Sequence, residues 1–171
     1  MDGQDGDEAT VAPLVALEAM DHARNMRMAI AEGGGNAVWP FGAVIVDAAS
    51  GAVVARGVNG AHLNPTLHGE VVALNDYVAR RGPDGLASTV LYTTAEPCPM
   101  CMGALIWAGV GAVVYGTSIE RLAELGVPQI RLSAVEVCAR ADFSQVRVLG
   151  GVLSEETDAL FANRARDDSN V

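Results

Sequence analysis

Apolar residues recur at helical spacing near the start of the chain and then give way to strand-like runs. In "PLVALEAMDHARNMRMAIAEGGG" they follow a period of about 3.6 residues, and a run of three glycines ends the pattern. This pattern predicts one helix over residues 13–32. The next stretch, "FGAVIVDAASGAVVARGVN", holds two valine-rich runs around a turn at Ala48–Gly51, which predicts a β-hairpin.

The rest of the chain alternates between helical patterns and short apolar runs. Gly126 is expected to end one helix, and Ser154 is expected to be the N-cap of the last one, since acidic residues fill its first turn. Strands are expected at 88–94, 111–117 and 145–153, and helices at 68–80, 99–109, 118–126 and 154–166. Strands that alternate with helices after a hairpin predict an α/β fold, a three-layer α/β/α sandwich with a central mixed five-stranded sheet.

Length and composition predict a single soluble domain. The 171 residues are 50% hydrophobic and 19% charged, so a packed core is expected over residues 10–166, with disordered polar ends at 1–9 and 167–171. Three cysteines, an odd number, do not make a disulfide framework. The acidic start is unlike a signal peptide and no apolar run has the length of a membrane span, which favours a cytoplasmic protein.

The net charge restricts the partners. At pH 7 the chain carries a formal charge of −10, and it has no basic tail. Proteins that bind nucleic acids neutralise phosphates with Lys and Arg, so a nucleic acid polymer is disfavoured as a partner. A small molecule is the expected substrate.

Two cysteines mark the most informative stretch, "TAEPCPMCMGAL". Cys98 and Cys101 fall where an expected strand meets an expected helix, and they share one face of its first turn. Such a pair fits a redox motif, half of a zinc site or a chance buried pair. A third ligand is available upstream in "NPTLHGE", where His68 precedes Glu70 at another expected helix start. One histidine and two cysteines would give zinc three ligands and leave the fourth position for water, as in catalytic sites.

HxE followed by PCxxC is typical of zinc-dependent nucleobase deaminases. From about Met20 to Val148 the chain resembles the cytidine deaminase-like superfamily, through "PFGAVIV", "RGVN", "NPTLHGE" and "LYTTAEPCPMCMGALIWAG". The resemblance implies one Zn²⁺ per chain on His68, Cys98 and Cys101. It also implies that Glu70 moves protons between a water and an aminated ring, which loses ammonia.

The resemblance also suggests pocket residues. Asn59 matches the family's base-binding asparagine, and Phe41, Gly42 and Ala43 match its pocket wall. Glu96 is expected either behind the metal ligands or as a group that orients the loop by capping a helix. The remaining candidates for substrate contact are Gly69, Trp107 and Glu96 itself. Trp39 and Trp107 are each open to a pocket-wall role or a core or subunit contact.

The substrate is less well defined than the chemistry. "PFGAVIV" and "EPCPMC" look most like guanine deaminases, whereas Gly69 in "TLHGE" looks like fungal cytosine deaminases. Asp142 and Phe143 could supply an acid and a ring to the pocket, or form an ordinary turn. Guanine is favoured over cytosine; a tRNA adenosine deaminase and an inactive zinc-folded binding module are further alternatives. A homodimer is expected, because "GALIWAGVGAVVYG" offers more apolar surface than one core needs.

Overall fold

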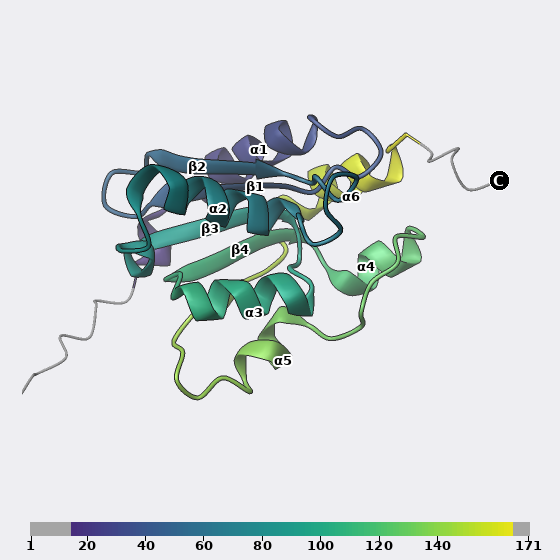
Figure 1. Cartoon of the computed structure of the whole chain (residues 1–171). Coiled ribbons are helices and arrows are strands. Elements are labelled where there is room, and N and C mark those ends of the chain that lie inside the picture. The colour runs from purple at the N-terminus through teal and green to yellow at the C-terminus, as the bar shows by residue number, and fades with distance from the viewer. Residues whose placement is uncertain (1–14, 166–171) are drawn as a thin grey trace, which may run out of the picture.

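The computed structural model describes residues 15–165, and five strands form one mixed sheet at its centre (Figure 1). The strand order is β2-β1-β3-β4-β5. Strand β1 pairs antiparallel with β2 and β3, while β3–β4 and β4–β5 are parallel. The strands are β1 Gly42–Asp47, β2 Val53–Val58, β3 Thr89–Ala95, β4 Ala112–Thr117 and β5 Arg147–Leu149.

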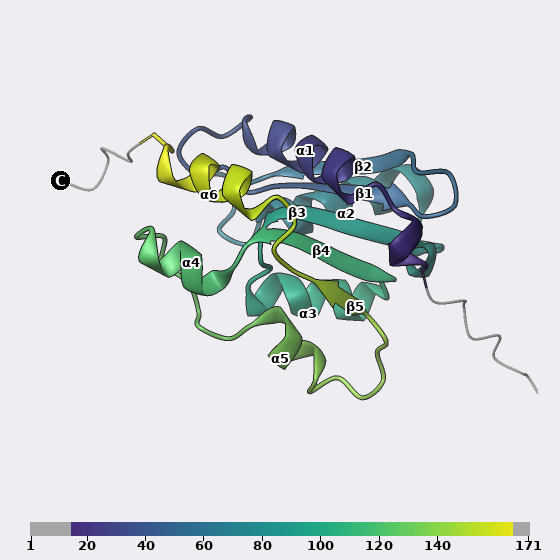
Figure 2. The ribbon, with the colours of Figure 1, turned by 180° about the vertical axis from the view of Figure 1, so that it is seen from behind.

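Helices cover both faces of the sheet. One face packs against α2 and α3, and the other against α1 and α6, as the view from behind shows (Figure 2). The helices are α1 His22–Gly33, α2 Gly69–Arg81, α3 Pro99–Ala108, α4 Ile119–Glu124, α5 Ala134–Cys138 and α6 Ser154–Ala162, with short 3-10 helices η1 Leu17–Ala19 and η2 Leu86–Ser88. The predicted three-layer α/β/α fold is confirmed.

The core follows from the alternation of side chains along the strands. In β1, Ala43 and Ile45 pack toward α2 and α3, while Val44 and Val46 pack toward α1. All seven residues of β3 are buried, which accounts for its continuous apolar run in the middle of the sheet.

Several element boundaries differ from the prediction, and α6, expected to run to residue 166, ends at Ala162. The helix expected over 13–32 is broken: Leu17–Ala19 forms a separate 3-10 turn, and α1 begins at His22 because the Asp21 side chain accepts a hydrogen bond from the Arg24 amide. The part of the expected helix before residue 15 lies outside the described residues. In the last helix, Ser154 is the first helical residue and not the N-cap that was expected. The N-cap is Leu153, which has a left-handed φ of 51° and makes no side-chain cap.

The strand expected at 145–153 is only three residues long. Gly151 follows it with a φ of +79°, and the Tyr115 ring packs so closely on Gly150 that a Cβ there would lie 2.3 Å from it. The two glycines therefore turn the chain away from the sheet and toward α6. The expected disordered ends, 1–9 and 167–171, lie outside the described residues. Over residues 15–165, no helix combines the length and the apolar character needed to cross a membrane.

Candidate zinc centre and substrate pocket

Three potential metal ligands converge where two helices begin. His68 precedes α2, Cys98 precedes α3, and Cys101 lies in the first turn of α3. Their ligand atoms all lie within 4.8 Å of one another, and Cys98 Sγ lies 3.6 Å from His68 Nδ1. Loops bring them together, since β3 delivers the cysteines and the segment after β2 delivers the histidine.

This donor set fits zinc. With zinc–sulfur and zinc–nitrogen distances of about 2.3 and 2.0–2.1 Å, the sulfur and nitrogen ligands of a tetrahedral site lie about 3.5 Å apart. The 3.6 Å between Cys98 Sγ and His68 Nδ1 matches that separation without rearrangement. Two sulfurs and one imidazole nitrogen suit zinc, and three protein ligands leave one tetrahedral position for a non-protein ligand.

The two thiols differ in their electrostatics. Hydrogen bonds from Cys101 and, to a lesser extent, His68 lower the pKa of the Cys98 thiol to about 4. The contact with Cys98, together with burial, raises the pKa of Cys101. The hydrogen bond to Cys98 also raises the pKa of His68. The lowered pKa favours the thiolate form of Cys98, and a thiolate is the form that binds metal.

Glu70 is buried next to this centre. It is the second residue of α2, its side chain is only 3% exposed, and one carboxylate oxygen accepts a hydrogen bond from Thr93 Oγ1 at 3.2 Å. Burial raises the pKa of the Glu70 carboxyl. A carboxyl whose pKa is raised by burial holds a proton more readily than an exposed one, which suits a group that takes up and releases protons, and Thr93 fixes its orientation.

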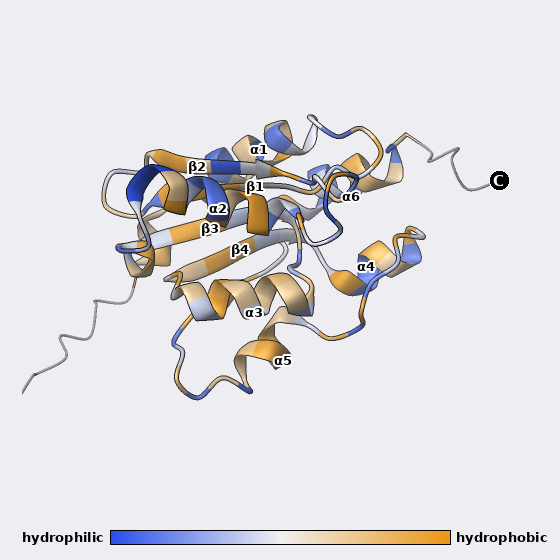
Figure 3. Ribbon diagram, in the orientation of Figure 1, coloured by the Kyte–Doolittle hydropathy of each residue, from blue (hydrophilic) through white to orange (hydrophobic). Residues whose placement is uncertain are grey.

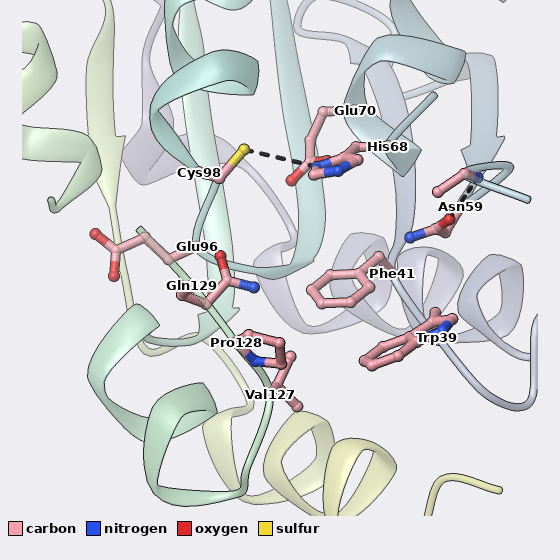
Figure 4. Close-up of a pocket in the computed structure, with 11 residues that line it drawn as sticks. Trp39, Phe41, Asn59, His68, Glu70, Glu96, Cys98, Val127, Pro128 and Gln129 are labelled. Atoms are coloured by element: carbon pink, nitrogen blue, oxygen red, sulfur yellow. Dashed lines mark hydrogen bonds between the residues drawn. The ribbon is translucent and has the colours of Figure 1, made fainter. Parts of the chain in front are cut away.

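A cavity of about 180 Å³ opens in front of Glu70, His68 and Cys98 (Figure 4). The rings of Trp39 and Phe41 line it on one side, and Asn59 lies on that side too, between the Trp39 ring and His68. Ala61 also lines the cavity. The wall facing the rings consists of Val127, Pro128 and Gln129, with Glu96 beside them.

Asn59 presents its amide nitrogen to the cavity. Its Oδ1 is occupied, because it accepts a hydrogen bond from the Ala61 amide at 2.8 Å. Its backbone is held as well: the Asn59 amide donates to Phe41 O, and Asn36 Nδ2 donates to Asn59 O. The Asn59 side chain therefore offers a donor to a ligand rather than an acceptor.

Glu96 caps two helices, although it borders the cavity. Its Oε2 accepts from the Ile119 amide at 2.9 Å and its Oε1 from the Ala134 amide at 2.8 Å, the first residues of α4 and α5. Of the two roles expected for Glu96, the structure shows the orienting one, for α4 and α5 rather than for α3. Glu96 thus fixes both ends of the segment that carries Val127 to Gln129.

Four other expected pocket residues lie outside the cavity. Gly42 allows β1 to approach α1, since a Cβ there would lie 2.2 Å from the Gly33 amide nitrogen. Ala43 is fully buried in the core on the α2 side. Gly69 packs on the backbone of Phe41, and Trp107 is 80% exposed on α3. Within one chain, none of these four lines the cavity.

The lining of the cavity also distinguishes the roles left open for Trp39, Trp107 and Phe143. Trp39 lines the cavity, whereas Trp107 stacks on Phe143 at 4.9 Å between ring centroids, away from it. Phe143 is 64% exposed, so it supplies no ring to the cavity. Sequence reasoning missed three lining residues, Val127, Pro128 and Gln129, because a loop without a motif cannot be assigned to a site before the positions of its two ends are known.

An α/β/α sheet that carries a His/Cys/Cys centre with a buried glutamate beside it defines a zinc-binding protein of the catalytic type. The family model for the cytidine and deoxycytidylate deaminase zinc-binding region matches residues 18–117. The chain belongs to this family, and the matched segment holds all three ligands and Glu70.

Relatives within the family differ in the bases that they are named for. The guanine deaminase of Bacillus subtilis (strain 168) is 44% identical over 89 residues, which are 51% of this chain and 56% of that enzyme, so the match spans little more than half of the relative. A probable cytosine deaminase of Schizosaccharomyces pombe is 29% identical over 68% of this chain and 74% of its own. Among solved structures, a guanine deaminase from Nitrosomonas europaea superposes with a TM-score of 0.68 at 26% identity, over 81% of this chain and 82% of that one.

Proposed function

We propose that the chain catalyses the hydrolytic deamination of a small aminated nucleobase, with guanine as the favoured substrate, and releases ammonia. The observation that carries the proposal is the buried Glu70 carboxyl at the floor of a ring-lined cavity, next to three converging zinc ligands. A purely structural zinc site has no use for an acid at its open position.

His68, Cys98 and Cys101 would hold zinc, which when bound supplies a Lewis acid that lowers the pKa of a water. Glu70 takes a proton from the attacking water and passes it to a ring nitrogen, while a C–O bond forms at the ring carbon that bears the amino group. Glu70 then takes the proton of the new hydroxyl group and gives it to the amino nitrogen, so that the hydroxyl becomes a carbonyl while the C–N bond breaks and ammonia leaves. The Thr93 hydroxyl keeps the carboxylate directed at the reacting atoms, and the product is the corresponding oxo base.

Size and charge support a free base or nucleoside as the substrate. The cavity of about 180 Å³ is smaller than the roughly 300–1,000 Å³ of pockets for drug-sized ligands. Trp39 and Phe41 suit the flat faces of a base, and the Asn59 amide nitrogen can donate to a ring nitrogen or carbonyl oxygen. The charge of −10 disfavours a tRNA substrate.

Guanine is favoured over cytosine for two reasons. The Bacillus relative, at 44% identity, is a guanine deaminase. In addition, Gly69, the residue that resembles cytosine deaminases, has a reason unrelated to the base: a Cβ there would lie 2.5 Å from Phe41 O. Cytosine stays the alternative, because the Schizosaccharomyces relative aligns over more of the chain.

Ammonia release from a panel of guanine, cytosine, adenine and their nucleosides tests the proposal. We expect the highest kcat/KM on guanine, and loss of turnover in Glu70→Gln with the zinc content unchanged. A higher kcat/KM on cytosine would replace guanine by the alternative. No ammonia from any compound, with one zinc bound per chain, would favour an inactive binding module.

A homodimer is part of the proposal, and the surface of α3 supports it. This helix contains no charged residue, and most of it lies toward the hydrophobic end of the colour scale in Figure 3. Met100 and Trp107, seven residues apart, are both exposed on it, and Phe143 lies against Trp107. A helix that is apolar on all sides is normally buried, and a second copy across a two-fold axis would cover this one.

A cytoplasmic location is proposed as well. The cysteines at the metal centre bind zinc only when reduced, and all three cysteines of the chain are free thiols in the structure. We further propose that residues 10–166 form the single deaminase domain.

A further inference from the structure

Two walls of the cavity are not part of the sheet. Trp39 lies in the connection between α1 and β1, and Val127 to Gln129 lie in the connection between α4 and α5. The two segments are almost ninety residues apart in sequence, and they face each other across the cavity (Figure 4). The distance between them therefore depends on whatever holds both from behind.

The end of the C-terminal helix α6 contacts both walls. Phe161 is fully buried and stacks on Phe41 with ring centroids 4.9 Å apart, in a cluster that also includes Val127 and Trp39. Four residues on, the Ala165 amide donates to Ala37 O at 2.8 Å, which ties the segment after α6 to the segment that carries Trp39.

Arg164 connects the same two walls through its guanidinium. Nη1 donates to Phe161 O at 2.7 Å and to Leu125 O at 3.2 Å, and Nη2 approaches Gly126 O at 3.4 Å. Leu125 and Gly126 end α4 and lead directly into Val127. The guanidinium carbon also lies 5.9 Å from the centre of the Trp39 ring, within the range of a cation–π contact.

These contacts suit a residue that holds two segments at a fixed separation. The backbone carbonyls at the ends of α4 and α6 carry partial negative charge, so a cation there is stabilised by both helix ends. Over residues 15–165, Arg164 forms no ion pair, and its hydrogen bonds go to carbonyl groups. At the other side of the same segment, Glu96 holds the first residues of α4 and α5.

We propose that Arg164 is a positioning residue that sets the width of the substrate cavity by holding the Val127–Gln129 wall against the Trp39 wall. Arg164 does not line the cavity, so it acts through these two walls and not on the reacting atoms. The proposal rests on the proposed function for its kinetic test alone. A looser cavity binds the base less tightly but leaves Glu70 and the metal ligands in place, so KM should change and kcat should not.

The test compares Arg164→Met, Arg164→Lys and Arg27→Met with the wild type. Methionine keeps much of the apolar stem and removes the guanidinium, whereas lysine keeps the charge without the planar fork. Arg27→Met is the matched control, because Arg27 also contacts α6, through an exposed ion pair with Glu156 at 2.7 Å, but lies away from the cavity. All variants are first checked for zinc content and melting temperature.

In Arg164→Met we expect KM for guanine to rise about tenfold, with kcat within about twofold of the wild type, since hydrogen bonds to charged groups are among the stronger ones. KM for Arg164→Lys should lie between the values for the wild type and Arg164→Met, and KM for Arg27→Met should equal the wild-type value. Unchanged KM in Arg164→Met, or the same rise in Arg27→Met, would overturn the proposal.

Fluorine NMR on 5-fluorotryptophan-labelled protein gives a readout that does not need activity. The chain has two tryptophans, so two signals are expected, and Trp107→Phe assigns them. Arg164→Met and Arg164→Lys should shift the Trp39 signal and leave the Trp107 signal in place. If the wild type deaminates no compound, the proposed function fails, but this measurement still tests the role of Arg164. An unshifted Trp39 signal in folded Arg164→Lys and Arg164→Met would refute that role.

Discussion

Replacing Gly69 by alanine tests whether this glycine serves the fold or the choice of base. A Cβ at Gly69 would lie 2.5 Å from Phe41 O and 3.1 Å from Phe41 C, and both are backbone atoms. The first distance is about 0.9 Å inside the 3.4 Å at which ordinary contacts begin. The φ of Gly69 is not in the left-handed region, so the strain in the variant would be steric only.

The expected loss follows from two opposing effects. Overpacking against fixed atoms costs about 1–3 kcal/mol, and the lower entropy of the unfolded alanine chain offsets about 0.4–1 kcal/mol of it. A net loss of about 1–2 kcal/mol corresponds to a melting temperature lower by roughly 2–8 °C for a chain of this size. Because the strain is relieved by moving the backbone of Phe41, KM for guanine should rise as well.

Gly103→Ala is the matched control, since a Cβ at this helical glycine would have no atom within 4 Å. It should melt at or above the wild-type temperature, because alanine favours a helix over glycine by up to about 1 kcal/mol. Calorimetry on the zinc-loaded proteins measures the melting temperatures of the two variants. A Gly69→Ala protein that melts at the same temperature as Gly103→Ala would show that the Phe41 backbone moves away from the added Cβ without loss of stability. The close contact with Phe41 would then no longer explain why position 69 is a glycine.

Three further predictions concern the site and the assembly. Glu70→Gln should keep zinc but lower kcat by about 10²–10⁴-fold, the range of general acid–base catalysis, and an active variant would mean that another group moves the protons. Cys101→Ala should lose both zinc, measured by elemental analysis, and thermal stability, while Cys138→Ala, at a half-buried thiol away from the centre, should keep one zinc per chain. In light scattering at micromolar concentration the wild type should have the mass of a dimer and Trp107→Lys that of a monomer; a monomeric wild type would contradict the proposed interface.

The sequence was sufficient for the layers of the fold and for the set of metal ligands. Strand periodicity and helix signals depend on neighbouring residues, so they are visible without a structure. His68, Cys98 and Cys101 were also recognisable, because each falls at a helix start with fixed local spacing, and the structure brings their ligand atoms together. The error at residues 13–32 arose because the apolar spacing continues through the break in the helix before Asp21. The error at Ser154 arose because acidic residues mark the first turn of a helix without showing which residue precedes it, and that residue is Leu153.

The glycines near the site show why local patterns failed for the pocket. Gly42 and Gly69 were expected at the pocket, but the atoms that approach them belong to Gly33 and Phe41 instead of a ligand. A sequence indicates that a position tolerates no side chain without indicating what occupies the space. Only the packing of α1 on β1, and of α2 on the end of the Trp39 segment, decides that question.

The cavity wall opposite the rings was beyond prediction for a different reason. Val127 to Gln129 carry no motif, and their position depends on Glu96 and Arg164, which come from segments before and after them in the chain. The residues that could hold zinc and the carboxyl proposed to transfer protons all lie between His68 and Cys101, whereas the contacts around the rest of the cavity extend to Arg164. If Arg164 sets the width of the cavity as proposed, changes at the end of the C-terminal helix are expected to alter which base is bound while the residues between His68 and Cys101 keep their places.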